Sequence, residues 1–148
     1  MLTKKEIVEI AINELKKYKL NTKIKVLNFK LFNKKALESP IIKQSLKEGN
    51  LLEELTIPAL VSHKTNTIYL SEETVRKLLK DEPITIQTRF IKSIVHHEIY
   101  HILEKKQFSF QDFDNALRLE EEATKKFKKH YPGLAALGRR ICKKYISE

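Results

Sequence analysis

The chain has 148 residues, a net charge of +10, 32% charged residues and 41% hydrophobic residues. This length suits one domain that buries roughly two-thirds of its surface, so it needs no covalent cross-link to fold. The single cysteine, Cys142, excludes an internal disulfide, and the apolar runs are far shorter than the roughly 20 residues of a membrane span. Because the first residues run into a charged helical pattern with no apolar signal core, we expect a cytoplasmic protein with no membrane partner.

The first third of the chain predicts a helix and a strand. Residues 3–18 begin with the spacing of a capping box and then place apolar side chains at helical period. Residues 23–31 alternate as a strand does, and a break in the alternation at residues 26–27 suggests a β-bulge. Residues 34–55 favour one or two short helices.

A hairpin and a further helix are expected next. Residues 59–62 and 67–70 are rich in strand-forming side chains, with a polar turn between them. Ser71 is expected to cap a helix whose first turn is acidic, as the helix dipole prefers. Residues 81–83 end this helix.

Three helices are expected in the second half, over residues 85–106, from residue 112 or 114 to residue 130, and over residues 134–146. The first is the longest, and its apolar side chains leave little of its circumference polar, which is typical of a buried helix. We find no linker or repeat, so residues 1–148 should form a single domain. The order of elements predicts an α+β fold with a small antiparallel or mixed sheet.

Residues 125–144 concentrate positive charge, with eight basic side chains and no acidic one. Clustered Lys and Arg could contact the phosphates of a nucleic acid. In a chain so rich in Lys and Glu, however, we expect a solvated helix face and regard nucleic acid as the less favoured partner.

The segment Ile94–Lys106, IVHHEIYHILEKK, holds three of the five histidines. His97 and His101 are one helical turn apart, so both imidazoles can reach one ion at about 2 Å. Glu98 lies beside them and could take a proton from a metal-bound water and pass it to a leaving amine, which is the division of labour in His-Glu-x-x-His peptidases. His96 points about 100° away, so we expect it to make a helix-side hydrogen bond or a solvent contact instead.

A catalytic zinc site takes three protein ligands and keeps one position open, so a third ligand must come from outside this helix. Three consecutive glutamates follow at residues 120–122, and helical phase separates them. Glu120 interrupts an apolar stripe and is the expected third ligand. Glu121 lies at the edge of the stripe and is held in reserve, whereas Glu122 points away and is expected to be solvated.

These residues resemble a known family. HEIYH, followed by eighteen residues and then EEEA, is similar to the gluzincin branch of the zincin metallopeptidases, and most like the soluble minimal gluzincins of archaea. The resemblance covers roughly Thr67–Phe127, and only the two zinc-site blocks are specific. It implies that His97, His101 and Glu120 bind zinc. Glu98 would then act as the general base and acid.

The resemblance also implies a zincin-like fold, in which the sheet packs on the central HExxH helix and a glutamate-bearing helix follows. The strand at residues 65–71 would be the edge strand beside which an extended peptide substrate lies. Gluzincins also use a downstream histidine or tyrosine to stabilise the oxyanion, and three side chains are candidates: His130, Tyr131 and Tyr145. Metzincins are excluded, since Glu104 and Gln107 occupy the places of their glycine and third histidine.

We therefore expect a cytoplasmic zinc metallopeptidase, a hydrolase that acts on a peptide or protein substrate through a minimal catalytic domain. Residues 134–148 would form a C-terminal helix that either regulates the site or only packs. The alternative is a zinc-binding regulatory or interaction module, of ImmA/IrrE type or associated with nucleic acid, in which catalysis is latent or lost.

Overall fold

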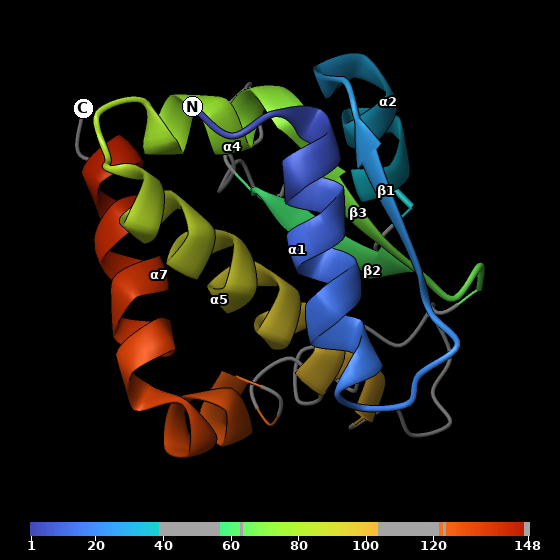
Figure 1. The fold of residues 1–148 in the computed structure, drawn as a ribbon. Coiled ribbons are helices and arrows are strands. Elements are labelled where there is room, and N and C mark those ends of the chain that lie inside the picture. Colours follow the sequence, from blue (N-terminus) through green and yellow to red (C-terminus); the bar gives the residue numbers. More distant parts are fainter. Residues whose placement is uncertain (39–56, 63, 104–121, 123, 147–148) are drawn as a thin grey trace, which may run out of the picture.

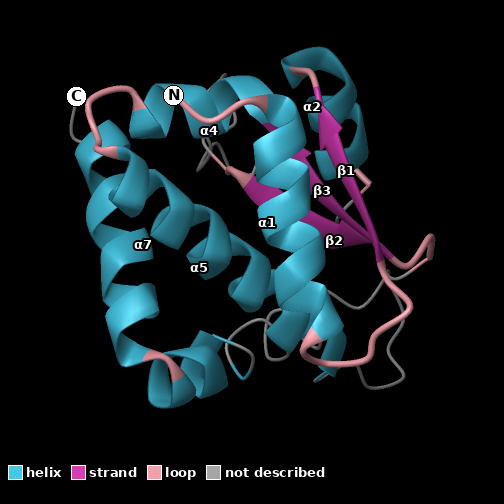
Figure 2. Ribbon diagram, viewed as in Figure 1, coloured by secondary structure: helices cyan, strands magenta, loops and turns pink. Residues whose placement is uncertain are grey.

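The computed structural model describes residues 1–38, 57–62, 64–103, 122 and 124–146. In chain order its elements are α1 (Lys4–Lys16), β1 (Lys23–Leu27), α2 (Phe29–Ala36), β2 (Ala59–Ser62), β3 (Thr67–Ser71), α4 (Glu72–Leu79), α5 (Ile84–Leu103) and α7 (Pro132–Ile146), with a further helical stretch at residues 124–130 (Figure 1 and Figure 2). The fold is α+β, as expected. Among the described helices, none combines the length and the apolar character that a membrane span needs.

The described strands form one mixed sheet in the order β1-β3-β2. β1 runs parallel to β3, with Lys23 opposite Thr67, and β2 runs antiparallel to β3, with Ser62 opposite the same threonine. Because β3 is paired on both sides, the expectation that residues 65–71 provide an edge strand for a substrate is wrong. The edges of the described sheet are β1 and β2.

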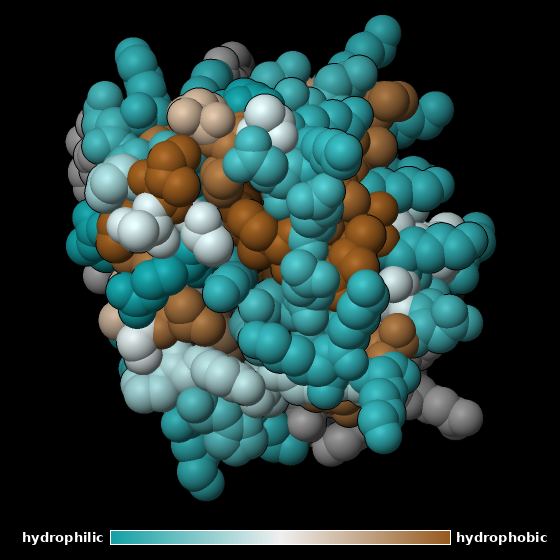
Figure 3. Space-filling view, viewed as in Figure 1, coloured by the Kyte–Doolittle hydropathy of each residue, from teal (hydrophilic) through white to brown (hydrophobic). Residues whose placement is uncertain are grey.

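Helices cover both faces of the sheet (Figure 1). One face shares a large apolar core with α1 and α5, to which Val26, Ile68 and Leu70 contribute. The opposite face packs against α2 around Phe32 and Tyr69. Side chains alternate between the two faces of a strand, so a short β3 can supply both cores. Figure 3 shows that hydrophilic side chains cover most of the outer face, with apolar atoms visible around α1.

α1 begins where the capping-box spacing predicts. The Thr3 side chain accepts a hydrogen bond from the Glu6 backbone N–H at 3.1 Å. The buried apolar side chains of the helix lie about one turn apart: Ile7, Ala11 and Leu15. The predicted amphipathic helix is therefore confirmed, and it ends at Lys16.

β1 ends earlier than predicted. The strand covers Lys23–Leu27, whereas residues 29–31, which were expected to continue it, form the first turn of α2. Asn28 starts this helix because its side chain accepts a hydrogen bond from the Leu31 N–H at 2.9 Å. The break in alternation at residues 26–27 therefore marks the end of a strand, and the predicted bulge is wrong.

The hairpin and the two helices after it are confirmed. β2 and β3 flank a turn in which Asn66 has a φ of 49°. The Ser71 side chain accepts a hydrogen bond from the Thr74 N–H at 3.4 Å and caps α4. α5 begins at Ile84, one residue before the predicted start, and residues 104–106 of the predicted helix lie outside the described part of the chain.

α7 packs beside α5 (Figure 1). Leu137 and Ile141 enter the main apolar core, and the Ser93 hydroxyl of α5 donates a hydrogen bond to the Leu134 carbonyl at 2.8 Å. Pro132 takes the first helical position, where its missing N–H is not needed, so the helix starts two residues earlier than predicted. The last helix is therefore an integral part of the core.

Candidate metal centre

The last two turns of α5 carry the candidate site. α5 lies between α1 and α7 (Figure 1), and most of its length is buried. Packing on both sides fixes the rotation of the helix about its axis, so the orientation of the motif is fixed as well. His97 and His101 are half-buried on one face, and Glu98 beside them is buried, with 7% of its surface exposed.

The donor atoms of these three side chains converge. The Nε2 atoms of His97 and His101 lie 3.0 Å apart, and their ring centroids lie 4.7 Å apart. Two nitrogen ligands at about 2.0–2.1 Å from a tetrahedral zinc ion are separated by roughly 3.3 Å. A carboxylate oxygen of Glu98 joins them in a group whose atoms all lie within 4.8 Å of one another. The two histidines therefore fit a zinc ion that both can reach.

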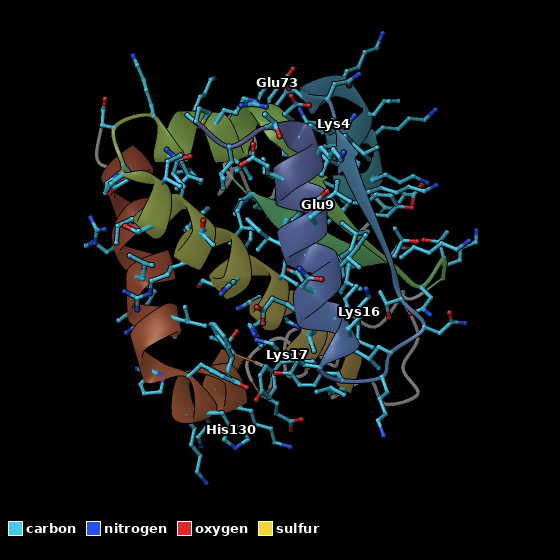
Figure 4. All side chains as sticks on the ribbon, in the orientation of Figure 1. Lys4, Glu9, Lys16, Lys17, Glu73 and His130 are labelled. Carbon is cyan, nitrogen blue, oxygen red and sulfur yellow. The ribbon has the colours of Figure 1, made fainter. Side chains whose placement is uncertain are left out.

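Aromatic side chains pack against one side of the two histidines. The Phe127 ring meets His97 edge-on, with centroids 5.9 Å apart, and lies 6.0 Å from the Tyr100 ring. The Tyr100 hydroxyl is 2.8 Å from His130 Nδ1. Phe127 and Tyr100 are buried, whereas His130 is exposed at the rim of the molecule (Figure 4). The rings exclude water from this side of the site.

Two of the candidates for oxyanion stabilisation, His130 and Tyr131, contact other side chains. His130 is held by Tyr100 and is not among the ligating side chains gathered around His97. Tyr131 is 36% exposed and lies against His96. The side chain of Tyr145 lies outside what the structure describes.

The predicted third ligand, Glu120, and its reserve, Glu121, lie outside the described residues. Glu122 is helical and half-buried, so it is less exposed than the solvated charge that helical phase predicted. Phe127 lies seven positions after Glu120, and therefore two helical turns further along the same predicted apolar stripe, and it packs on His97. The described end of the stripe therefore faces the candidate site, and the assignment of Glu120 stays a prediction.

His96 lies in a buried polar cluster behind the site, which confirms the expected helix-side hydrogen bond. Its Nε2–H donates to Glu14 Oε2 at 2.6 Å, and its Nδ1 lies 2.9 Å from the Tyr18 hydroxyl. The Tyr18 hydroxyl is 3.3 Å from that of Tyr131, whose ring centroid lies 4.7 Å from that of His96. Because Glu14 and Tyr18 both come from the N-terminal segment, the cluster ties α1 to the helix that carries the histidine pair.

Burial and hydrogen bonding set the charge states in this cluster. Burial acts to raise the pKa of the Glu14 carboxyl, but hydrogen bonds from Lys17 and His96 outweigh it, and the pKa is lowered. Burial, aided by the nearby Lys17 and Lys92 cations, lowers the pKa of His96, although the hydrogen bond and charge of Glu14 act in the opposite direction. A neutral imidazole therefore links the carboxylate to Tyr18 at neutral pH. Burial and the nearby Tyr131 hydroxyl raise the pKa of Tyr18.

Sequence reasoning missed Glu14, although the signal was present. Glu14 lies on the buried stripe of α1 with Ile7 and Leu15. A carboxylate on an apolar stripe needs a hydrogen-bonding or cationic partner, and the same pattern had singled out Glu120. Applied to the first helix, this rule would have identified Glu14 as a buried, partnered group.

Comparison with models of protein families, with curated protein sequences and with solved structures gave no match.

Proposed function

We propose that the protein is a zinc-dependent metallopeptidase of the gluzincin type. The observation that carries the proposal is the convergence of the His97 and His101 Nε2 atoms beside the buried Glu98 on one turn of α5. Paired imidazoles favour zinc over magnesium or calcium, which prefer oxygen ligands. A carboxylate beside such a pair is the arrangement by which His-Glu-x-x-His zinc peptidases hydrolyse peptide bonds.

Each residue of the site would have a separate role. His97 and His101 would hold the zinc ion, and Glu120 would complete the ligand set. Bound zinc would supply Lewis-acid chemistry by polarising a water molecule and the substrate carbonyl. The Glu98 carboxylate would accept a proton from the attacking water and then donate it to the nitrogen of the departing amine. The burial of Glu98 would keep bulk water from competing for that proton.

An extended peptide substrate would lie along β2. The resemblance to zincins implies that the substrate pairs with an edge strand, and β3 is central in the described sheet. β2 is an edge strand among those described, and it packs against α5. Its backbone groups could bind the main chain of a substrate by β-augmentation, whatever the side chains of that substrate. Unfolded protein and flexible peptides are therefore the expected substrate class.

Cleavage of unfolded casein and of a mixed peptide library tests the proposal. Zinc-loaded protein should generate new peptide termini, detected by mass spectrometry. Glu98→Gln should lower the rate at least about 100-fold, the usual contribution of a general base, while zinc stays bound. Glu9→Gln, an exposed change on α1, is the matched control and should cleave normally.

Zinc-loaded protein that leaves every bond intact would contradict this proposal. It would favour the alternative, a zinc-binding regulatory or interaction module. Equal cleavage by the wild type and by Glu98→Gln would instead contradict the role of Glu98.

A further inference from the structure

A lysine-rich surface on β1 and α2 indicates a binding function that is independent of the candidate metal centre. Residues 16–35 carry eight lysines and no aspartate or glutamate. Six of these lysines are exposed and form no ion pair with any residue that the structure describes, and four of the six lie on β1 and α2: Lys23, Lys25, Lys30 and Lys34. We call these four residues the β1–α2 lysine surface.

The fold brings these lysines to one side of the sheet. Lys23 and Lys25 share the face of β1 on which Leu27 packs against the α2 core, since side chains alternate along a strand. Lys35 Nζ lies 5.7 Å from the centre of the Tyr69 ring, and Tyr69 is the register partner of Lys25. The last turn of α2 therefore lies over the same face, close to the lysines of β1. In Figure 4, many side chains with nitrogen ends project from this side of the molecule, at the right of the view.

The lysines of α2 also share one side of their helix. Lys30 and Lys34 are four positions apart, so they lie one above the other at a separation of about 6 Å along the axis. Lys23 and Lys25 are about 7 Å apart along the strand. The surface is thus two pairs of cations with a similar spacing, contributed by adjacent elements.

Structural explanations account for only part of this pattern. The helix dipole favours basic residues in the last turn of α2, but it does not act on β1. Lysines on the edge strand β1 would discourage it from pairing with strands of other chains, but this protection does not require lysines on α2. A polyanionic partner accounts for both elements and for the absence of acidic residues from 16 to 35.

We propose that the β1–α2 lysine surface binds the phosphate backbone of double-stranded DNA without reading the base sequence. Lysine contacts phosphates as a point charge, and such contacts supply sequence-independent affinity. Phe32 and Tyr69 are buried and Phe29 is half-buried, so this surface offers charge rather than rings for stacking on unpaired bases. This favours a duplex over a single strand.

Fluorescence anisotropy with a short labelled DNA duplex of random sequence, measured in EDTA, tests the proposal apart from any bound zinc. Four phosphate contacts give a slope near −3.6 in a plot of log affinity against log salt concentration, which is about a 150-fold loss between roughly 50 and 200 mM salt. The variant K23Q/K25Q/K30Q/K34Q should bind at least about tenfold more weakly at the lower salt concentration and lose about 3 to 4 units of slope.

The matched control removes four exposed lysines, from α4 and its C-cap and from residues 124–130: K77Q/K80Q/K128Q/K129Q. Both variants lower the net charge of +10 by four, to +6. The control should keep most of the slope. Circular dichroism checks that each variant is folded. If the quadruple variant unfolds, K23Q/K25Q and K30Q/K34Q should each lose about half of the slope.

Three results would overturn the proposal. The wild-type protein could fail to bind the duplex at low salt. The control variant could lose as much affinity as the β1–α2 variant, which would assign binding to net charge or to the basic segment at residues 125–144. The wild type could bind vesicles of phosphatidylcholine and phosphatidylserine but not the duplex, which would assign the surface to an anionic membrane.

Discussion

Replacing the buried Glu14 carboxylate tests how α5 is held in place. Glu14→Leu removes the acceptor of the His96 Nε2–H, at 2.6 Å, and the partner of the Lys17 ammonium, at 2.9 Å. A hydrogen bond to a charged group contributes about 1.5–3 kcal/mol. The Lys17 side chain is 61% exposed, so its ion pair adds at most about 1 kcal/mol. We expect the free energy of unfolding to fall by about 2–4 kcal/mol, and the melting temperature by about 4–16 °C.

Urea denaturation of metal-free protein, followed by circular dichroism, measures this change. Glu14→Gln keeps one acceptor oxygen and should lose about half as much stability. Glu9→Gln, an exposed change on the same helix, should stay within about 0.5 kcal/mol of the wild type. If Glu14→Leu is as stable as Glu9→Gln, the reasoning about the buried cluster is wrong.

Three further predictions follow from the same structure. The pKa of Glu14 is lower in the folded state than its ordinary value of 4.5, so the Glu14 carboxylate stabilises the fold above that pH and ceases to do so as the pH falls below it. Urea denaturation at acidic pH should show this loss of stability in the wild type and a smaller loss in Glu14→Gln. Zinc at about 100 times its dissociation constant should raise the melting temperature by about 5–10 °C, and an equal rise in His97→Ala would contradict the site. Phe127→Ala should lower the free energy of unfolding by about 3–5 kcal/mol, because the Phe127 side chain is only 4% exposed. A decrease of less than about 1 kcal/mol in urea denaturation would show that the ring is not packed as described.

Removal of α7 has a separate expected outcome. Leu137 and Ile141 are buried in the main core, and burial of each contributes about 1.5–3 kcal/mol. A chain that stops before residue 132 should therefore lose cooperative thermal unfolding, measured by circular dichroism. A truncated chain that stays folded and cleaves peptides faster would instead identify α7 as an inhibitory segment.

Local signals in the sequence predicted much of the fold. The caps at Thr3 and Ser71 lie where their spacing to the following helix indicated, because a cap is a contact within one turn. The hairpin was readable because its strands are adjacent in the chain. The pairing of His97 with His101 was equally local, since helical periodicity alone places both imidazoles on one face.

Contacts between distant segments could not be read in the same way. The parallel pairing of β1 with β3 makes β3 central, and no residue of either short strand specifies that partner. The contact of Glu14 with His96 joins positions 82 residues apart in the chain. Periodicity could show that each side chain is buried, but not that they meet. The end of β1 was missed because Asn28 suits a strand end and a helix cap equally well.

An equilibrium zinc titration measures whether the histidine pair of α5 holds a metal ion. Calorimetry with a competing chelator would compare the wild type with His101→Ala, and His130→Ala would serve as a control because His130 lies outside the converging group. One zinc ion should bind per chain in the wild type and in His130→Ala, and binding should be greatly weakened in His101→Ala. A wild-type chain that binds no zinc, or equal binding by all three proteins, would contradict the proposed zinc site.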